Sequence, residues 1–284
     1  MLIFKGKSDF QNRLFVSIVA ITIAAFLIGF AYNPLVNILL VTVVALLTGV
    51  GVWEYAKLAE AKGLQPARRL MVIVATLEVI AFYAALAYPE WSKYILPVTV
   101  FGFISFFIAH FKKNENALTH VAVEFFGVCY LAIPFGFMLA ILYPPAGVGD
   151  GRFWLMYLIA VTKITDIGGY VFGKLVGKHP LAPHLSPNKT IEGSVGGFIF
   201  AILLSLLLAL VSPLMGSHLS FTNAVWLGML IGIFAQLGDL AESVLKRDAL
   251  VKDSNKIPGI GGVLDLVDSV LLTAPVVYFF IRSL

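Results

Sequence analysis

The sequence predicts an all-α polytopic membrane protein with about nine transmembrane helices, its N-terminus in the cytoplasm and its C-terminus outside. Of the 284 residues, 60% are hydrophobic and only 13% are charged, and the mean hydropathy is +0.94. Soluble globular domains lie far below this hydrophobic content. The remaining observation is the distribution of Lys and Arg along the chain, which predicts the orientation.

Each predicted helix is an apolar stretch of about 20 residues, the length that crosses a hydrocarbon core of about 30 Å. The stretches run approximately over Leu14–Phe30, Pro34–Trp53, Leu70–Ala87, Tyr94–Phe111, Leu118–Tyr143, Phe153–Phe172, Gly193–Val211, Ala224–Leu245 and Gly262–Ile281.

Basic residues are concentrated on one side of this arrangement. With the N-terminus inside, the even-numbered connections between helices also face the cytoplasm. Of the 20 Lys and Arg residues, all but four lie near the N-terminus or in these connections. The exceptions are Lys93, Arg152 and Arg282 on the opposite side and Lys163 within a predicted helix. Such an asymmetry predicts the orientation given above.

Acidic residues divide the chain into two regions. Residues 1–145, with five predicted helices, have only Glu78 and Glu124 within their predicted spans and are interpreted as a transmembrane scaffold. Residues 146–284, with four predicted helices and two cytoplasmic loops, are interpreted as the catalytic region. A charge near the bilayer centre costs about 3 kcal/mol, so a group of acids there indicates function. A homodimer is left open, and nucleic acid is not an expected partner.

The stretch from Gly238 to Ser269 contains two pairs of acids. Asp239 and Glu242 are three residues apart near the end of the eighth predicted helix, and Asp265 and Asp268 repeat this spacing at the start of the ninth. Residues three apart share one helical face, and a short hairpin would bring both pairs together. Carboxylate oxygens are the ligands that Mg²⁺ requires, and two such ions can hold the attacking and leaving oxygens of a phosphoryl transfer.

Basic residues and glycines surround these acids. They are Lys246, Arg247, Lys252, Gly259, Gly261 and Gly262. Ion pairs between the acids and these bases at the membrane surface explain the pattern as well as a metal does, so both interpretations stay open from spacing alone. The glycines also suit a polyphosphate, because they let backbone N–H groups approach phosphate oxygens.

A second polar stretch begins at Asp166, which lies three residues after Lys163 inside the sixth predicted helix. An internal ion pair is one interpretation of this spacing. The loop that follows contains candidate anion-binding residues, namely Ser186, Asn188, Lys189, Thr190 and Glu192. A polar loop that caps the next helix is the structural alternative. The density of hydroxyl, amide and ammonium groups also fits an anionic ligand.

Two motifs in this region resemble those of one enzyme family. The first is Ser243-x-x-Lys246-Arg247-x4-Lys252-Asp253 followed by Pro258-Gly259-x-Gly261-Gly262-x-x-Asp265-x-x-Asp268-Ser269. The second comprises Asp166, Tyr170, Gly173 and the block from Leu181 to Gly193. Trp53-Glu54-Tyr55 resembles a third, weaker motif. On these residues the chain is similar to the phosphatidate cytidylyltransferases, or CDP-diacylglycerol synthases, over its whole length.

The resemblance implies transfer of a cytidylyl group from CTP to phosphatidate, giving CDP-diacylglycerol and pyrophosphate in phospholipid biosynthesis. It implies Mg²⁺ at two cation positions and a site that faces the cytoplasm from a bacterial inner membrane. The implied metal ligands are Asp239, Asp265 and Asp268, with Glu242 and Asp166 as further candidates. The implied catalytic set adds Lys246, Arg247 and Lys252. The implied substrate-binding residues are Ser186, Asn188, Lys189, Thr190, Glu192, Ser243, Asp253, Gly259, Gly261 and Gly262.

The sequence departs from the family pattern at two positions. Ile260 stands where the family usually has His, and Leu266 stands where it usually has Arg. These replacements remove two positive charges from a site that must hold a triphosphate. The alternatives are therefore a related CTP-dependent enzyme acting on another lipid, or an inactive paralogue. An ion-coupled transporter is the alternative from another class, since intramembrane acids and glycine-broken helices are also typical of transporters.

Overall fold

The computed structural model describes residues 9–112, 115–145, 147–251, 254 and 262–283, with side chains from residue 18 onward. Within these ranges the chain forms nine α-helices: α1 (Asp9–Gly29), α2 (Pro34–Ala61), α3 (Arg68–Ala87), α4 (Ile95–His110), α5 (Ala117–Leu142), α6 (Gly151–Val176), α7 (Ile191–Val211), α8 (Phe221–Asp248) and α9 (Val263–Arg282). Short 3₁₀ helices η1 (Pro89–Tyr94) and η2 (Ser212–Met215) precede α4 and α8.

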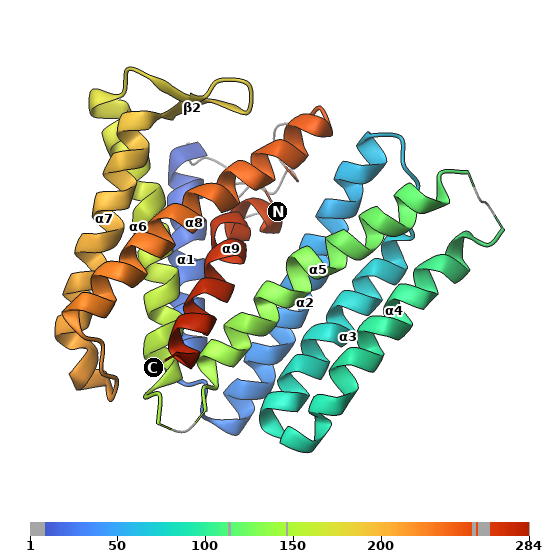
Figure 1. Cartoon of the computed structure of the whole chain (residues 1–284), viewed down its shortest axis with the longest axis horizontal. Helices are drawn as coiled ribbons and strands as arrows, with labels where there is room; N and C mark the ends of the chain where they lie inside the picture. Colours follow the sequence, from blue (N-terminus) through green and yellow to red (C-terminus); the bar gives the residue numbers. More distant parts are fainter. Residues whose placement is uncertain (1–8, 113–114, 146, 252–253, 255–261, 284) are drawn as a thin grey trace.

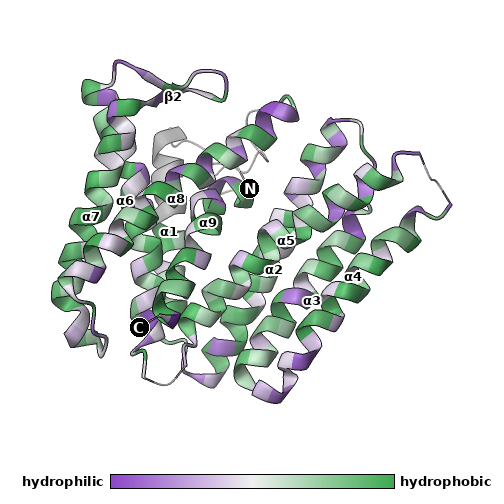
Figure 2. Cartoon of the chain, in the orientation of Figure 1, coloured by the Kyte–Doolittle hydropathy of each residue, from purple (hydrophilic) through white to green (hydrophobic). Residues whose placement is uncertain are grey.

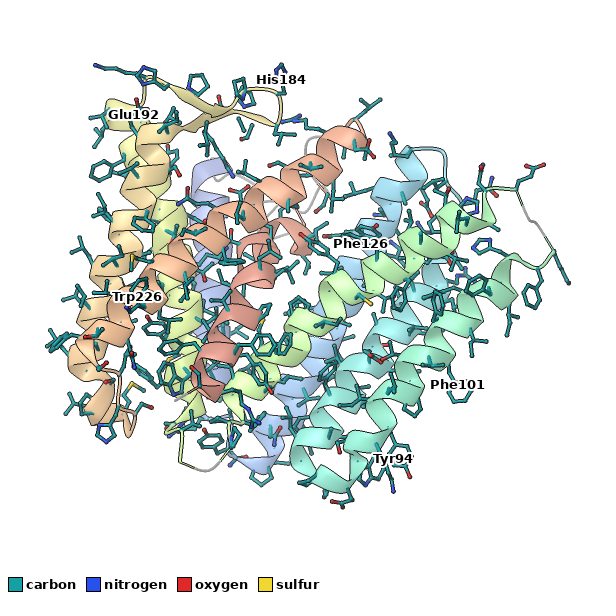
Figure 3. All side chains as sticks on the ribbon, in the orientation of Figure 1. Tyr94, Phe101, Phe126, His184, Glu192 and Trp226 are labelled. Atoms are coloured by element: carbon teal, nitrogen blue, oxygen red, sulfur yellow. The ribbon has the colours of Figure 1, made fainter. Side chains whose placement is uncertain are left out.

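The helices confirm the predicted all-α polytopic membrane class. Eight spans in the described part are long and apolar enough to cross a membrane, and the apolar segment Ile18–Gly29 of α1 is shorter. Hydrophobic residues cover the middle of the bundle and hydrophilic ones gather towards its two ends (Figure 2). Large apolar side chains such as Phe101 point away from the bundle (Figure 3). Phe101 and Trp226 are 69% and 61% exposed. Such a surface suits lipid, where helices satisfy their own backbone hydrogen bonds.

The connections between helices alternate between the two ends of the bundle (Figure 1). The α2–α3 and α4–α5 connections, the segment between α6 and α7 and the end of α8 lie at one end, which includes most of the described Lys and Arg residues. The α5–α6 connection and the end of α9 lie at the other. Successive connections therefore lie at opposite ends of the bundle, as the predicted orientation requires. Which end faces the cytoplasm stays a prediction.

The segment between α6 and α7 folds as a β-hairpin, which the sequence reasoning interpreted only as a polar loop. Strands β1 (Pro180–Ala182) and β2 (Ser186–Thr190) pair antiparallel, with Pro180 opposite Thr190 and Ala182 opposite Ser186. Three prolines within eleven residues prevent a helix here, because proline lacks the N–H that a helix requires. Thr190 then caps α7 by accepting a hydrogen bond from Gly193 N at 3.1 Å.

The helices that surround the acidic residues pack in sequence order: α6 contacts α7, α7 contacts α8 and α8 contacts α9. Helix α9 also contacts α2 and α5, so it joins the last four helices to the first five. The α6–α7 contact is close because α7 presents Gly197 to the backbone of α6. A Cβ atom added at Gly197 would lie 2.6 Å from the backbone oxygen of Thr165.

Replacement of Gly197 by Ala is therefore expected to destabilise the protein by about 1–3 kcal/mol, the usual cost of overpacking against atoms that cannot move aside. The midpoint of thermal denaturation in detergent should fall below that of wild type. Gly29→Ala is the matched control, because a Cβ atom at Gly29 meets nothing within 4 Å. Equal midpoints for the two variants would contradict the close contact between α6 and α7.

Candidate active site

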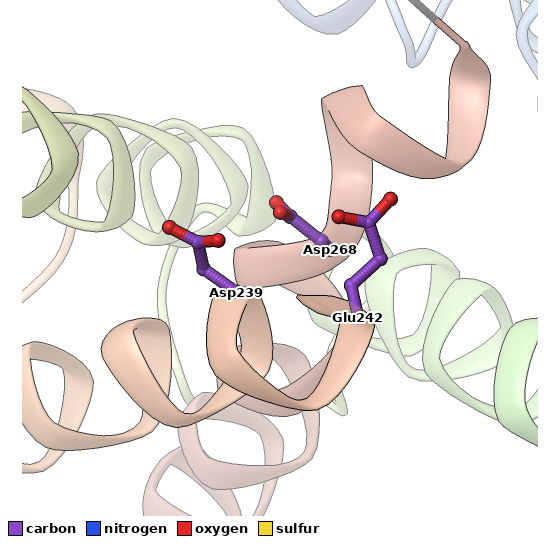
Figure 4. Close-up of side chains that lie close together, drawn as sticks. All are labelled: Asp239, Glu242 and Asp268. Atoms are coloured by element: carbon purple, nitrogen blue, oxygen red, sulfur yellow. The ribbon is translucent and has the colours of Figure 1, made fainter. Parts of the chain in front are cut away.

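Helices α8 and α9 are in close backbone contact at Gly238. A Cβ atom there would lie 2.5 Å from the backbone oxygen of Asp268 and 3.0 Å from Cα of Ser269, so only glycine fits. This approach places Asp268 of α9 beside Asp239 and Glu242, which follow Gly238 on α8. The structure thereby brings together three of the acids that the sequence proposed as metal ligands (Figure 4).

One carboxylate oxygen from each of these three residues lies within 4.8 Å of the others. Glu242 is 1% exposed and Asp268 is 7% exposed, and the side chain of Asp239 is partly exposed. Buried carboxylates at this spacing repel each other and are stabilised by a cation. Oε1 of Glu242 accepts no hydrogen bond from the described residues. The donor set and this buried oxygen fit a hard divalent cation, which prefers carboxylate ligands.

Two lysines from different elements form ion pairs with the cluster of Asp239, Glu242 and Asp268. Lys246 Nζ lies 2.5 Å from Glu242 Oε2 and 2.7 Å from Asp265 Oδ1. Lys189 Nζ, from the hairpin, lies 2.5 Å from Asp239 Oδ2. From the sequence, ion pairs between acids and bases were the alternative to a metal site. The structure contains both such ion pairs and the acidic cluster. The ion pairs lower the electrostatic cost of holding these carboxylates close to one another.

Asp166 adjoins the cluster through Ser269 on α9. The hydroxyl of Ser269 lies 3.3 Å from both carboxylate oxygens of Asp166 and donates to Oδ1 of Asp268 at 3.1 Å. Lys163 Nζ lies 3.4 Å from Asp166 Oδ2 and donates to the backbone oxygen of Leu266 at 3.0 Å. The expected internal ion pair therefore exists, and Lys163 brings a positive charge to the helical turn where Leu266 replaces the arginine of the family pattern.

A cavity of about 430 Å³ opens beside the cluster between α6, α7, α8 and the hairpin. Its polar lining comes from Thr165, Asp166, Tyr170, Lys174, Asn188, Lys189, Thr190, Ser194, Gln236 and Asp239. Asp239 belongs both to this lining and to the acidic cluster. A ligand in the cavity would therefore contact basic and amide groups while it reached a cation held by the carboxylates.

Several predicted residues lie elsewhere. Asp265 is not one of the three clustered acids, but its carboxyl contacts Glu242 of the cluster as well as Lys246 and Ser254. Glu192 accepts hydrogen bonds from the backbone N–H groups of Lys178 and His179 and from the ring of His179, so it fastens the hairpin. Arg247 donates to the backbone oxygen of Leu185 at 2.9 Å.

Three further predicted residues of the described part do not line the cavity. Ser186 is in β2, Ser243 is half-buried on α8, and Gly262 is the residue that precedes α9. Lys252, Asp253, Gly259, Ile260 and Gly261 lie outside the described residues.

Two polar side chains that shape this region had no role assigned from the sequence: Gln236 was not singled out, and Glu54 was named only within the third, weaker motif. Gln236, one turn before Asp239 on α8, donates to the backbone oxygen of Ser194 at 3.1 Å and so joins α8 to α7. Glu54 of α2 accepts a hydrogen bond from Leu264 N at the start of α9. Each is a polar residue in or beside a predicted apolar span, and that contrast is the signal that could have identified it.

The fold and the site together define an α-helical membrane protein in which a largely buried acidic cluster adjoins a cavity lined by two lysines, two aspartates and neutral polar groups. Comparison with known proteins gives the family. The model of the cytidylyltransferase family matches residues 11–284, and the chain belongs to this family of nucleotidyltransferases. The resemblance inferred from the two motifs is confirmed.

Curated relatives agree with this assignment. The chain is 32% identical to the phosphatidate cytidylyltransferase of Chlamydia pneumoniae over 295 residues, which cover 98% of this chain and 95% of the relative. It is 33% identical to the phosphatidate cytidylyltransferase of Synechocystis sp. over 267 residues, which cover 84% of this chain and 86% of the relative. A shorter match, 41% identical over 143 residues, is to the uncharacterized protein YnbB of Escherichia coli and covers 50% of this chain and 47% of that protein.

Replacement of Asp268 by Asn is expected to weaken Mn²⁺ binding by about tenfold or more, since changing even a residue that only supports a ligand typically costs about that much. Binding is measured in detergent from the electron paramagnetic resonance signal of free Mn²⁺. Asp248→Asn is the matched control, because Asp248 lies on α8 but pairs with Lys62 at the surface, 2.8 Å away. Equal Mn²⁺ affinity in the two variants would rule out Asp268 as a ligand.

Proposed function

We propose that this protein transfers the cytidylyl group of CTP to phosphatidate, producing CDP-diacylglycerol and pyrophosphate. The observation that carries the proposal is the position of Asp239, which belongs both to the acidic cluster and to the lining of the cavity that contains Lys174 and Lys189. The names of the relatives from Chlamydia pneumoniae and Synechocystis support the same reaction.

In the proposed reaction, a phosphate oxygen of phosphatidate attacks the α-phosphorus of CTP. A new P–O bond forms, the bond between the α-phosphorus and its bridging oxygen to the β-phosphorus breaks, and pyrophosphate leaves with that electron pair. The attacking phosphate is already ionised near neutral pH, so no general base is required. Catalysis then consists mainly of positioning and charge stabilisation, as is general for phosphoryl transfer.

The side chains around the cavity supply these two functions. Lys174 and Lys189 stand where they can contact phosphate oxygens, and the amide of Asn188 adds a neutral donor. Asp239, Glu242 and Asp268 would hold Mg²⁺, which neutralises negative charge on the phosphates when it is bound. Asp166, linked to Asp268 through Ser269, is the proposed carboxylate for a second cation position.

Activity is tested with purified protein, CTP labelled in the cytosine ring, phosphatidate and Mg²⁺. Wild type should form a lipid-soluble CDP product, and removal of Mg²⁺ by EDTA should abolish its formation. If CTP is consumed only with a different lipid acceptor, the substrate assignment is wrong. Formation of no lipid-linked product with any lipid phosphate would overturn the proposed function.

Replacement of Lys189 by Ala should lower kcat/KM for CTP by about 10- to 100-fold, because a hydrogen bond to a charged group contributes about 1.5–3 kcal/mol. Lys178→Ala is the matched control: Lys178 is exposed near the hairpin and does not line the cavity. If Lys189→Ala and Lys178→Ala show the same kinetics, Lys189 does not contact CTP.

We also propose that the hairpin end of the bundle faces the cytoplasm of a bacterial inner membrane, where CTP is available. The test uses single cysteines at exposed positions of the two ends, His184→Cys in the hairpin and Ser92→Cys in η1, in a Cys129→Ser background. A membrane-impermeant maleimide should label Cys at position 92 in spheroplasts, and position 184 only after lysis. The reverse pattern would invert the topology.

A further inference from the structure

Glu54, on α2 in the N-terminal region, lies against the first turn of α9. Its side chain is fully buried, at 0% exposure. Oε2 accepts a hydrogen bond from Leu264 N at 2.9 Å and another from the hydroxyl of Ser254 at 3.2 Å. Glu54 and Leu264 are 210 positions apart, so this contact ties the beginning of the chain to the helix that contains Asp268.

The start of α9 depends on an acceptor from another element. Gly262 precedes the helix and provides no side-chain cap, while the first N–H groups of any α-helix lack partners within the helix. A carboxylate at this end also interacts favourably with the helix dipole. A Cβ atom at Gly262 would lie 2.6 Å from Oε2 of Glu54, so glycine is what admits the carboxylate. Glu54 therefore caps α9 from α2.

A continuous series of contacts leads from Glu54 to the cation cluster. The hydroxyl of Ser254 donates to Glu54 and is also 2.9 Å from Oδ2 of Asp265. The other oxygen of Asp265 contacts Lys246 at 2.7 Å, and Lys246 lies 2.5 Å from Glu242. Each member of the series fixes the orientation of the next, and the last belongs to the cluster.

We propose that Glu54 is a positioning residue for the cation site, acting through the first turn of α9 and through Ser254, Asp265 and Lys246. Glu54 is a member neither of the acidic cluster nor of the cavity lining in the described part of the chain, so its proposed role is positioning rather than catalysis. The proposal rests on the proposed function in one respect, since it takes the cluster to bind the divalent cation used in cytidylyl transfer. It also makes the N-terminal region part of the site rather than a scaffold alone.

The test replaces Glu54 by Gln and Ser254 by Ala, with Glu60→Gln as the matched control. Glu60 lies on the same helix and pairs with Arg68 at the surface. Mn²⁺ affinity, the thermal midpoint and the kinetics with CTP are measured on the full-length protein. Glu54→Gln should weaken Mn²⁺ binding by about 10- to 100-fold, as is typical when a residue that orients metal ligands is changed. Ser254→Ala should weaken it by a smaller factor, and Glu60→Gln should match wild type.

A purely structural role would lower the folded fraction without changing the Mn²⁺ affinity of the folded protein. If Glu54→Gln does not fold, Ser254→Ala decides, because it removes only the connecting hydroxyl. Wild-type Mn²⁺ affinity in folded Glu54→Gln, or in Ser254→Ala when Glu54→Gln is unfolded, overturns the proposal. If wild type forms no CDP-lipid but Glu54→Gln still loses Mn²⁺ affinity, the proposed function fails and the positioning role stands.

Discussion

The site depends on the backbone contact between α8 and α9 at Gly238. Because this residue has no Cβ atom, α9 can approach closely enough for Asp268 to meet Asp239 and Glu242. Bringing buried carboxylates together is electrostatically unfavourable, and the effective cost of burying a charge is several kcal/mol. Lys246 and Lys189 offset part of this cost, and a divalent cation would offset more. The backbone contact between α8 and α9 at Gly238 thus determines where the three carboxylates gather.

The membrane explains why this charge lies on helices. A helix satisfies its backbone hydrogen bonds internally, so only the side chains need partners where water is scarce. The acidic cluster lies on the C-terminal part of α8 and the N-terminal part of α9. The C-terminal end of α8 lies at the same end of the bundle as the β-hairpin (Figure 1). The cavity lies beside the cluster, between three helices and the hairpin. This position suits a reaction that joins a water-soluble nucleotide to a lipid phosphate.

Much of this architecture could be predicted from local patterns. Each predicted apolar stretch coincides with a helix, because length and hydropathy alone define a span. The spacing of Asp239 and Glu242 correctly placed both on one helical face.

The hairpin was missed because its strands are too short to show an alternating pattern. Asp265 contacts both Lys246 and Glu242, partners that only the crossing of α8 and α9 determines, and its role as a metal ligand stays a prediction. The contact of Glu54 with Leu264 joins distant positions, which no local pattern reveals.

We propose above all that Asp239, Glu242 and Asp268 together bind a divalent cation, and anomalous diffraction from crystals grown with Mn²⁺ would locate it. An anomalous peak should lie in direct contact with carboxylate oxygens of all three residues. A peak bound elsewhere, or an ordered cluster with no peak at saturating Mn²⁺, would contradict it.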